Sequence, residues 1–241
     1  MRKVFILGLD GLEWSIAKDY ANLRQTEWGR VDTHGTRTWT PLCWGCIITG
    51  IEPQKLMKLL IKKGRYYLLR DDVKTIFDLT PKHIKLFIPC LNPHSRYWSK
   101  EDIELMKKAL FVRGTYRIKF ELACRSLLNQ QFNEVMKHIK RDWDLFMVHF
   151  NNPDMFQHAF MCDERKVREF YKLLDNLANR IWSSLDSNVV RLVISDHGFR
   201  CIKGRIPFHA DDAFYSCNVK LGLKYPKLWD FYKVIRDLLR K

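Results

Sequence analysis

The sequence lacks any long hydrophobic run. Its first apolar segment, Val4–Leu9, follows two basic residues and superficially suggests a signal peptide, but Asp10 ends it after six residues. A signal peptide needs an apolar core of roughly 7–15 residues. A membrane span needs roughly 18 or more, and no segment of the chain approaches that length. We therefore expect a soluble, cytoplasmic protein with no membrane partner.

Cysteine is also sparse, with seven residues scattered along the 241. An odd, unpatterned set argues against a disulfide framework and favours a reducing compartment. Cys43 and Cys46 have CxxC spacing, but no second pair follows, which argues against a redox or zinc-binding role for them.

Acidic residues are outnumbered, 27 against 42 lysines and arginines, and the formal net charge is +15. Such a balance predicts attraction to anionic substrates or polyanions. A long basic stretch, Arg113–Arg141, is either the solvated face of a helix or a surface that meets nucleic acid or another polyanion. No nucleic-acid-binding motif accompanies it.

Continuous apolar runs alternate with amphipathic stretches along the chain. The runs at Val4–Leu9, Ile84–Ile88, Leu145–Phe150 and Val189–Ile194 have the pattern of strands buried on both faces. The stretches between them carry apolar residues at helical spacing; they are Gln54–Lys63, Asp102–Leu110, Arg117–Ile139 and Glu164–Leu185. This alternation predicts an α/β fold with a mostly parallel central sheet and helices on both faces. No linker or repeat divides the chain, so we expect one domain over residues 1–241.

Three aspartates follow three of these strands, each near a histidine. Asp10 comes after the first run, Asp154 follows the third and precedes His158 by four residues, and Asp196 adjoins His197 after the fourth. Parallel strands bring their carboxyl ends to one edge of the sheet, where ligand sites form. Carboxylates and imidazoles at such an edge suit a two-metal site for displacement at phosphorus. His209 is a further candidate ligand.

Thr40 opens a second informative segment, which runs to Gly50. Pro41 suits the first position of a helix, which makes Thr40 its expected N-cap and Gly50 its stop. A hydroxyl at a helix N-terminus lies where an anion is favoured, and a metal on that hydroxyl would make it a nucleophile. The alternative is that Thr40 only caps the helix.

Together these motifs resemble the alkaline phosphatase superfamily, in particular its type I phosphodiesterase/nucleotide pyrophosphatase branch in a short intracellular form. The similar segments occur in the family's order: residues 5–11, residues 40–50, Asp154 with His158, residues 195–198, and His209. The resemblance implies the superfamily's three-layer sandwich and a metal-dependent hydrolase of phosphodiester or pyrophosphate bonds acting on a nucleotide-like substrate.

The resemblance also implies a role for each matching residue. Asp10, Thr40, Asp196 and His197 would hold one divalent ion, and Asp154, His158 and His209 would hold the other. Thr40 would attack phosphorus and form a covalent intermediate that water hydrolyses. Histidine and aspartate ligands suit Zn²⁺, with Mn²⁺ as a substitute.

The sequence departs from the family pattern at two places that border the substrate. The His-Gly that commonly follows residues 49–50 in the family is missing after Pro53, and Leu42 and Cys43 stand where an asparagine often follows the nucleophile. Asn151 or Asn152 is a candidate substitute. Two other functions stay open: a phosphomonoesterase of the same superfamily, and a basic polyanion-binding protein with a vestigial metal site.

Overall fold

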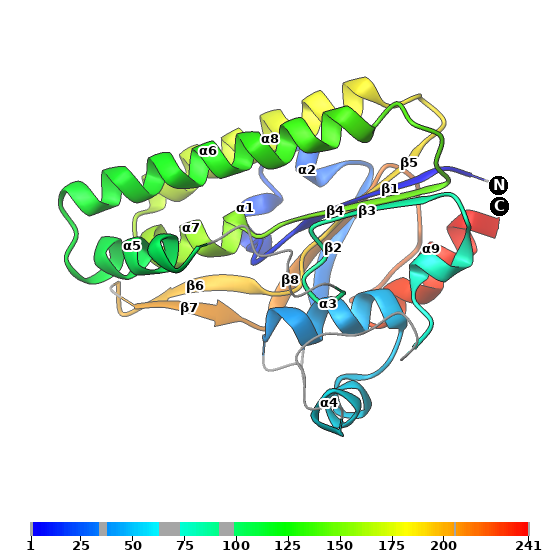
Figure 1. The fold of residues 1–241 in the computed structure, drawn as a ribbon, viewed down its shortest axis with the longest axis horizontal. Helices are drawn as coiled ribbons and strands as arrows, with labels where there is room; N and C mark the ends of the chain where they lie inside the picture. Colours follow the sequence, from blue (N-terminus) through cyan, green and yellow to red (C-terminus); the bar gives the residue numbers. More distant parts are fainter. Residues whose placement is uncertain (1, 34–37, 63–72, 92–98, 205, 241) are drawn as a thin grey trace.

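The computed structural model describes residues 2–33, 38–62, 73–91, 99–204 and 206–240. Their centre is a six-stranded sheet in the order β2-β8-β5-β1-β4-β3 (Figure 1). The four strands β5, β1, β4 and β3 run parallel, which confirms the predicted mostly parallel sheet. The strands span β1 Val4–Leu9, β2 Glu27–Asp32, β3 His83–Leu86, β4 Leu145–Phe150, β5 Val190–Ile194 and β8 Asp212–Cys217.

Helices cover both faces of this sheet, also as predicted (Figure 1). The long helices α6 and α8 lie across one face, and α3, α4 and α9 lie on the other. The helices span α1 Trp14–Ala17, α2 Ala21–Arg24, α3 Thr40–Thr49, α4 Pro53–Lys62, α5 Lys100–Phe111, α6 Thr115–His138, α7 Asn152–Phe160, α8 Glu164–Ser184 and α9 Asp230–Arg240, with the 3-10 turn η1 at Ile76–Leu79.

The buried strands explain why the sequence showed continuous apolar runs. Alternate residues of β1 enter different cores: Phe5 and Leu7 join the cluster beneath α6 and α8, whereas Val4 and Ile6 join the cluster beneath α3 and α9. A strand covered on both faces has no solvent-facing side on which polar residues could alternate.

Two features of the sheet were not predicted from the sequence. Strands β2 and β8 add an antiparallel edge to the parallel strands. A separate hairpin, β6 (Gly198–Ile202) with β7 (Ile206–Ala210), lies beneath α7 and outside the main sheet (Figure 1).

The start of α3 corrects one prediction. Thr40 is the first helical residue, and Trp39 is the N-cap, because the Trp39 carbonyl accepts the first helical hydrogen bonds, from Leu42 and Cys43 at 2.9 and 3.0 Å. The Thr40 hydroxyl is therefore not the cap. Gly50 ends the helix in the left-handed conformation (φ 71°), as predicted. The last residue of the predicted helical stretch at residues 54–63 lies outside the described residues.

The cysteines correct another expectation. Cys162 and Cys201 form a disulfide, whereas Cys43, Cys46, Cys90, Cys124 and Cys217 are buried thiols. One bond is not a framework, but it weakens the inference of a reducing compartment, which rested on scattered cysteines in the sequence. Among the described residues, no helix combines the length and apolar character needed to cross a membrane.

Candidate metal centre

The predicted site residues meet at the carboxyl edge of the parallel strands. Asp10 follows β1, and Asp196 and His197 follow β5. Asp154 and His158 lie on α7, which begins directly after β4, and His209 comes from β7 of the hairpin. Strand termini that are far apart in the sequence thus supply one compact cluster of side chains.

The first group contains Asp10, Asp196 and His197, whose ligand-type atoms lie within 4.8 Å of one another. His197 Nε2 is 3.2 Å from Asp10 Oδ1 and 3.7 Å from Asp196 Oδ2. All three side chains are almost fully buried. A buried set of two carboxylates and one imidazole has the donor types that bind Zn²⁺ or Mn²⁺.

The second group contains Asp154, His158 and His209 and meets the same distance limit. The carboxylate of Asp154 is 3.5 Å from His158 Nε2 and 3.2 Å from His209 Nε2. These side chains are only partly buried, so this group is open to solvent where the first is closed. Asp154 Oδ1 also approaches His197 Nε2 at 3.7 Å, which makes the two groups neighbours.

Backbone carbonyls orient two of the imidazoles. The Nδ1 atom of His197 donates to the carbonyl of Gly198 at 3.0 Å, and that of His209 donates to the carbonyl of Thr38 at 3.2 Å. With Nδ1 occupied in this way, Nε2 of each ring faces the carboxylates. Histidine ligands of metals are commonly held by such a bond from the other ring nitrogen.

Two further residues border the first group. Thr40 Oγ1 lies 3.4 Å from Asp10 Oδ1, so the first residue of α3 points its hydroxyl at the cluster. His149, within β4, contacts the other oxygen of Asp10, with Nε2 at 3.0 Å from Oδ2. Sequence analysis missed this role of His149 because it lies inside a buried strand, with no motif around it.

Glycine keeps the cluster compact. Gly11 has φ 68°, and a Cβ there would lie 3.1 Å from the Asp154 backbone and 3.2 Å from the His197 ring. Its N–H donates to Asp196 Oδ1 at 3.1 Å. The glycine after Asp10 therefore allows the β1–α1 loop to pass between two ligand-bearing segments.

Three buried polar atoms in the cluster have no hydrogen bond with suitable geometry among the described residues: Asp154 Oδ1, Asp196 Oδ2 and His197 Nε2. A buried donor or acceptor without a partner is costly, and a native structure contains few of them. Here all three atoms are of ligand type and converge on one region. The residues therefore fit divalent cations, which would bind these atoms directly.

Comparison with known proteins shows the family of the chain. The family model for type I phosphodiesterase/nucleotide pyrophosphatase matches residues 67–220, nearly two thirds of the chain. The chain belongs to this family. The matched region contains Asp154, His158, Asp196, His197 and His209, whereas Asp10 and Thr40 precede it. Membership of this phosphodiesterase family supports a phosphoester hydrolase. Among curated proteins, no sequence matches the chain.

Solved structures support the same fold at low sequence identity. The PH0037 protein of Pyrococcus horikoshii is 12% identical with a TM-score of 0.54 over 99% of this chain and 97% of its own. Alkaline phosphatase from the Antarctic bacterium TAB5 is 14% identical with a TM-score of 0.53 over 99% and 98%. Murine ectonucleotide pyrophosphatase/phosphodiesterase 5 is 13% identical with a TM-score of 0.51; the alignment covers 84% of this chain but 59% of the murine one. These likenesses concern the fold.

The electrostatics of the cluster show crowded negative charge. Burial, and then the charge of Asp10, raise the pKa of the Asp196 carboxyl well above its usual range. Burial also raises the pKa of Asp10, but hydrogen bonds from His149 and His197 outweigh it, so this pKa is lowered. Opposite shifts are typical of carboxylates that share a buried site.

The His197 imidazole responds to the same carboxylates. Burial lowers its pKa, but Asp196, Asp10 and Asp154 outweigh this effect and raise the pKa to about 10. The surroundings of His197 thus favour a positive charge, and a divalent cation in the cluster would supply it.

Proposed function

We propose that the protein is a two-metal hydrolase of phosphodiester or pyrophosphate bonds that uses Thr40 as its nucleophile. Asp10, Thr40, Asp196 and His197 would hold one divalent ion, and Asp154, His158 and His209 would hold the other. The observation that carries the proposal is the pair of adjacent three-residue groups, beside a threonine hydroxyl, with three buried ligand-type atoms lacking hydrogen bonds.

The roles of the chain's own residues follow from their positions. Thr40 Oγ1 attacks phosphorus, the bond from phosphorus to the leaving oxygen breaks, and water later releases the phosphoryl group from Thr40. Asp10 accepts a hydrogen bond from Thr40 and so orients its hydroxyl, while His149 holds Asp10 from behind. Divalent ions at such a site lower the pKa of the attacking hydroxyl and stabilise the charge that develops on the phosphoryl oxygens.

The nature of the ligands points to zinc. Three imidazoles and three carboxylates match the nitrogen and oxygen donors that Zn²⁺ prefers, and Mn²⁺ accepts the same set. Magnesium favours sites richer in oxygen and retains several waters.

A nucleotide-like substrate is proposed from the family description. Asn151 and Asn152 are the candidates for a side-chain amide that holds a phosphoryl oxygen. Asn152 donates its side-chain N–H to Gln131 in the buried interior, at 2.9 Å, so this amide is already engaged. Asn151 is therefore the better candidate of the two.

The test is metal-dependent hydrolysis of two synthetic esters. Purified protein loaded with Zn²⁺ or Mn²⁺ should hydrolyse bis-p-nitrophenyl phosphate faster than p-nitrophenyl phosphate, and EDTA should abolish both reactions. Thr40→Ala should lose activity while retaining bound metal. Faster hydrolysis of the monoester would make the protein a phosphomonoesterase, and full activity of Thr40→Ala would remove Thr40 as nucleophile.

The polyanion-binding alternative predicts another result. Nucleic-acid binding would be steeply salt-dependent and would survive loss of Asp10 and Asp196. In the structure, acidic partners offset part of the basic stretch: Arg117 pairs with Asp163, Arg125 with Glu121, and Lys137 with Glu134.

A cytoplasmic location stays a proposal. Disulfides persist in oxidising compartments and in intracellular proteins of hyperthermophiles, and other cytosolic disulfides are usually transient or redox-sensing; in a cytoplasmic protein, Cys162–Cys201 would belong to one of the last two kinds. Fractionation of the source cells tests the location directly.

A further inference from the structure

The disulfide lies beside the second ligand group. Cys162 follows His158 by four residues, just past the end of α7, and its partner Cys201 lies on β6. In the hairpin register Cys201 pairs with Pro207, two residues before His209. The bond thus joins α7, which carries two ligands, to the hairpin, which carries the third.

The hairpin depends on such links for its position. It is a two-stranded sheet separate from the central one, and an isolated hairpin of this kind is marginally stable. Three of its large apolar side chains, Ile202, Ile206 and Phe208, are 41%, 56% and 60% exposed and contribute little packing, whereas Phe199 near the base is fully buried. Near its base, Phe199 N donates to Glu13 and Arg200 pairs with Asp212. Towards its turn, Cys201 ties it covalently to α7.

The ligand group needs a fixed hairpin. His209 Nε2 is 3.2 Å from both Asp154 Oδ1 and His158 Nε2, and the His209 ring stacks on His197 at 4.0 Å. A displacement of β7 by an ångström or two moves one of the three ligands and leaves the other two on α7. The first group has no member on the hairpin. Its residue His197 adjoins the hairpin base at Gly198, and that base is also held by the hydrogen bond from Phe199 N to Glu13, which does not depend on the disulfide.

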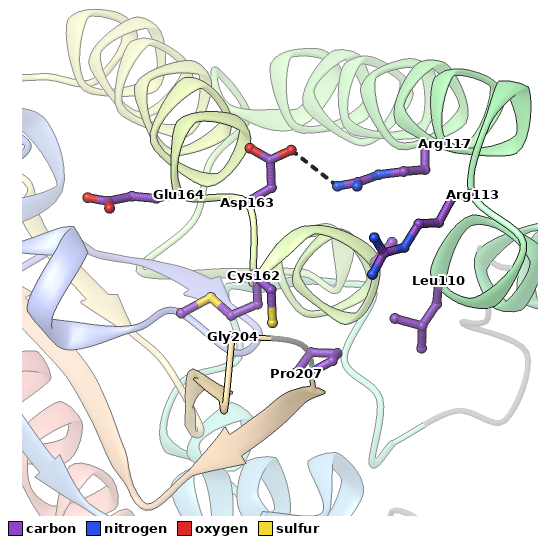
Figure 2. Close-up of a pocket in the computed structure, with 10 residues that line it drawn as sticks. Leu110, Arg113, Arg117, Cys162, Asp163, Glu164, Gly204 and Pro207 are labelled. Atoms are coloured by element: carbon purple, nitrogen blue, oxygen red, sulfur yellow. Dashed lines mark hydrogen bonds and ion pairs between the residues drawn. The ribbon is translucent and has the colours of Figure 1, made fainter.

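A reductant can reach the bond. Cys162 is exposed and lines a pocket of about 340 Å³ between the α5–α6 turn, the end of α7 and the hairpin (Figure 2). Arg113 and Arg117 line the same pocket together with Asp163 and Glu164. Cys201 lines a second pocket of about 440 Å³.

We propose that the Cys162–Cys201 disulfide positions the second metal-ligand group, and that its reduction by a dithiol weakens metal binding there while the first group is unaffected. This inference rests on the proposed two-metal site. In the reduction, a thiolate of the dithiol attacks one cysteine sulfur and releases the other as a thiolate, which takes up a proton. The second thiol then displaces the first cysteine. Two electrons pass to the protein, and the reductant becomes a disulfide.

Calorimetric titration of metal-free protein with Zn²⁺ tests the inference. The oxidised chain should bind two ions. Cys162→Ser/Cys201→Ser should bind one with unchanged affinity and the other roughly 10–100-fold more weakly, the range typical when support for a ligand is lost. Cys124→Ala, which removes a free cysteine buried on α6, is the control and should bind both ions as the wild type does.

A second arm needs no substitution. Wild-type protein reduced with a phosphine, which binds zinc weakly compared with a dithiol, should lose the same single site, and reoxidation should restore it. Equal affinities in oxidised and reduced protein would overturn the inference and leave the proposed function intact. Loss of both ions together would indicate a general structural role and would also overturn it. Fewer than two ions in the oxidised protein would overturn both proposals.

Discussion

Replacement of His149 by phenylalanine is expected to weaken metal binding at the first ligand group. His149 is 3% exposed, its Nε2 holds Asp10 Oδ2 at 3.0 Å, and its ring meets Trp44 edge-on at 4.8 Å. Phenylalanine fills similar space but cannot donate, so Asp10 loses the group that fixes its second oxygen.

The size of the effect follows from that lost contact. Residues that orient a metal ligand typically contribute 10–100-fold to affinity, which corresponds to about 1.4–2.8 kcal/mol. In the metal-free protein, the buried Asp10 Oδ2 without a partner should lower the free energy of unfolding by about 1–3 kcal/mol. Metal titration measures the first quantity, and urea unfolding of the metal-free protein measures the second.

His138→Phe is the matched control, because His138 lies on α6 and pairs only with Glu134 among its described ionic partners. It should leave metal affinity unchanged and shift stability by no more than about 0.5 kcal/mol. If His149→Phe bound metal as tightly as the wild type and unfolded at the same urea concentration, His149 would have no role in holding Asp10.

Three other predictions concern stability and are measured by urea unfolding. Cys162→Ser/Cys201→Ser should lower the free energy of unfolding by up to about 4 kcal/mol, because the disulfide closes a loop of 39 residues and so restricts the unfolded chain. An unchanged free energy of unfolding would show that the disulfide does not stabilise the fold in this way. Burial raises the pKa of Glu27, but hydrogen bonds from the N–H groups of residues 221–223 outweigh burial, so the pKa in the folded protein is lowered. The stabilisation that Glu27 provides is therefore complete above the pKa of the unfolded chain and is lost as the pH falls through the pKa of the folded protein. The deficit of Glu27→Gln should therefore be largest near pH 7 and shrink towards pH 3, and a pH-independent deficit would contradict this. Gly198→Ala should lower the free energy of unfolding by about 1–3 kcal/mol, because the alanine Cβ would lie 2.6 Å from Glu13 Oε2 and closer still to the Asp212 carbonyl. An unchanged free energy of unfolding would mean that the backbone at residue 198 shifts without cost.

The sequence predicted those parts of the fold in which burial leaves an unambiguous pattern. The strands at Val4–Leu9 and Leu145–Phe150 were predicted at their observed bounds because both faces of each strand are apolar. The edge strand Glu27–Asp32 mixes charged, aromatic and glycine residues, which is no regular alternation. The hairpin strand Ile206–Ala210 contains a proline and two exposed apolar residues, so neither periodicity nor burial marks it.

Most residues of the candidate site could be predicted from the sequence, but not all of them. The aspartates and histidines at strand ends were recognisable, and the structure brings all of them together with Thr40. His149 and the Cys162–Cys201 pairing depend on which segments touch in space, which one sequence does not reveal. The metal-binding roles of the residues, the Thr40 nucleophile and the single domain over residues 1–241 stay predictions.

The central claim is that two ions bind through two separable groups of side chains. Elemental analysis of protein reconstituted with Zn²⁺ and freed of loosely bound metal tests it most directly. We predict two ions per chain in the wild type, one in Asp196→Asn/His197→Ala, and one in His158→Ala/His209→Ala. Fewer than two ions per wild-type chain, or loss of both ions in either double variant, would contradict the account.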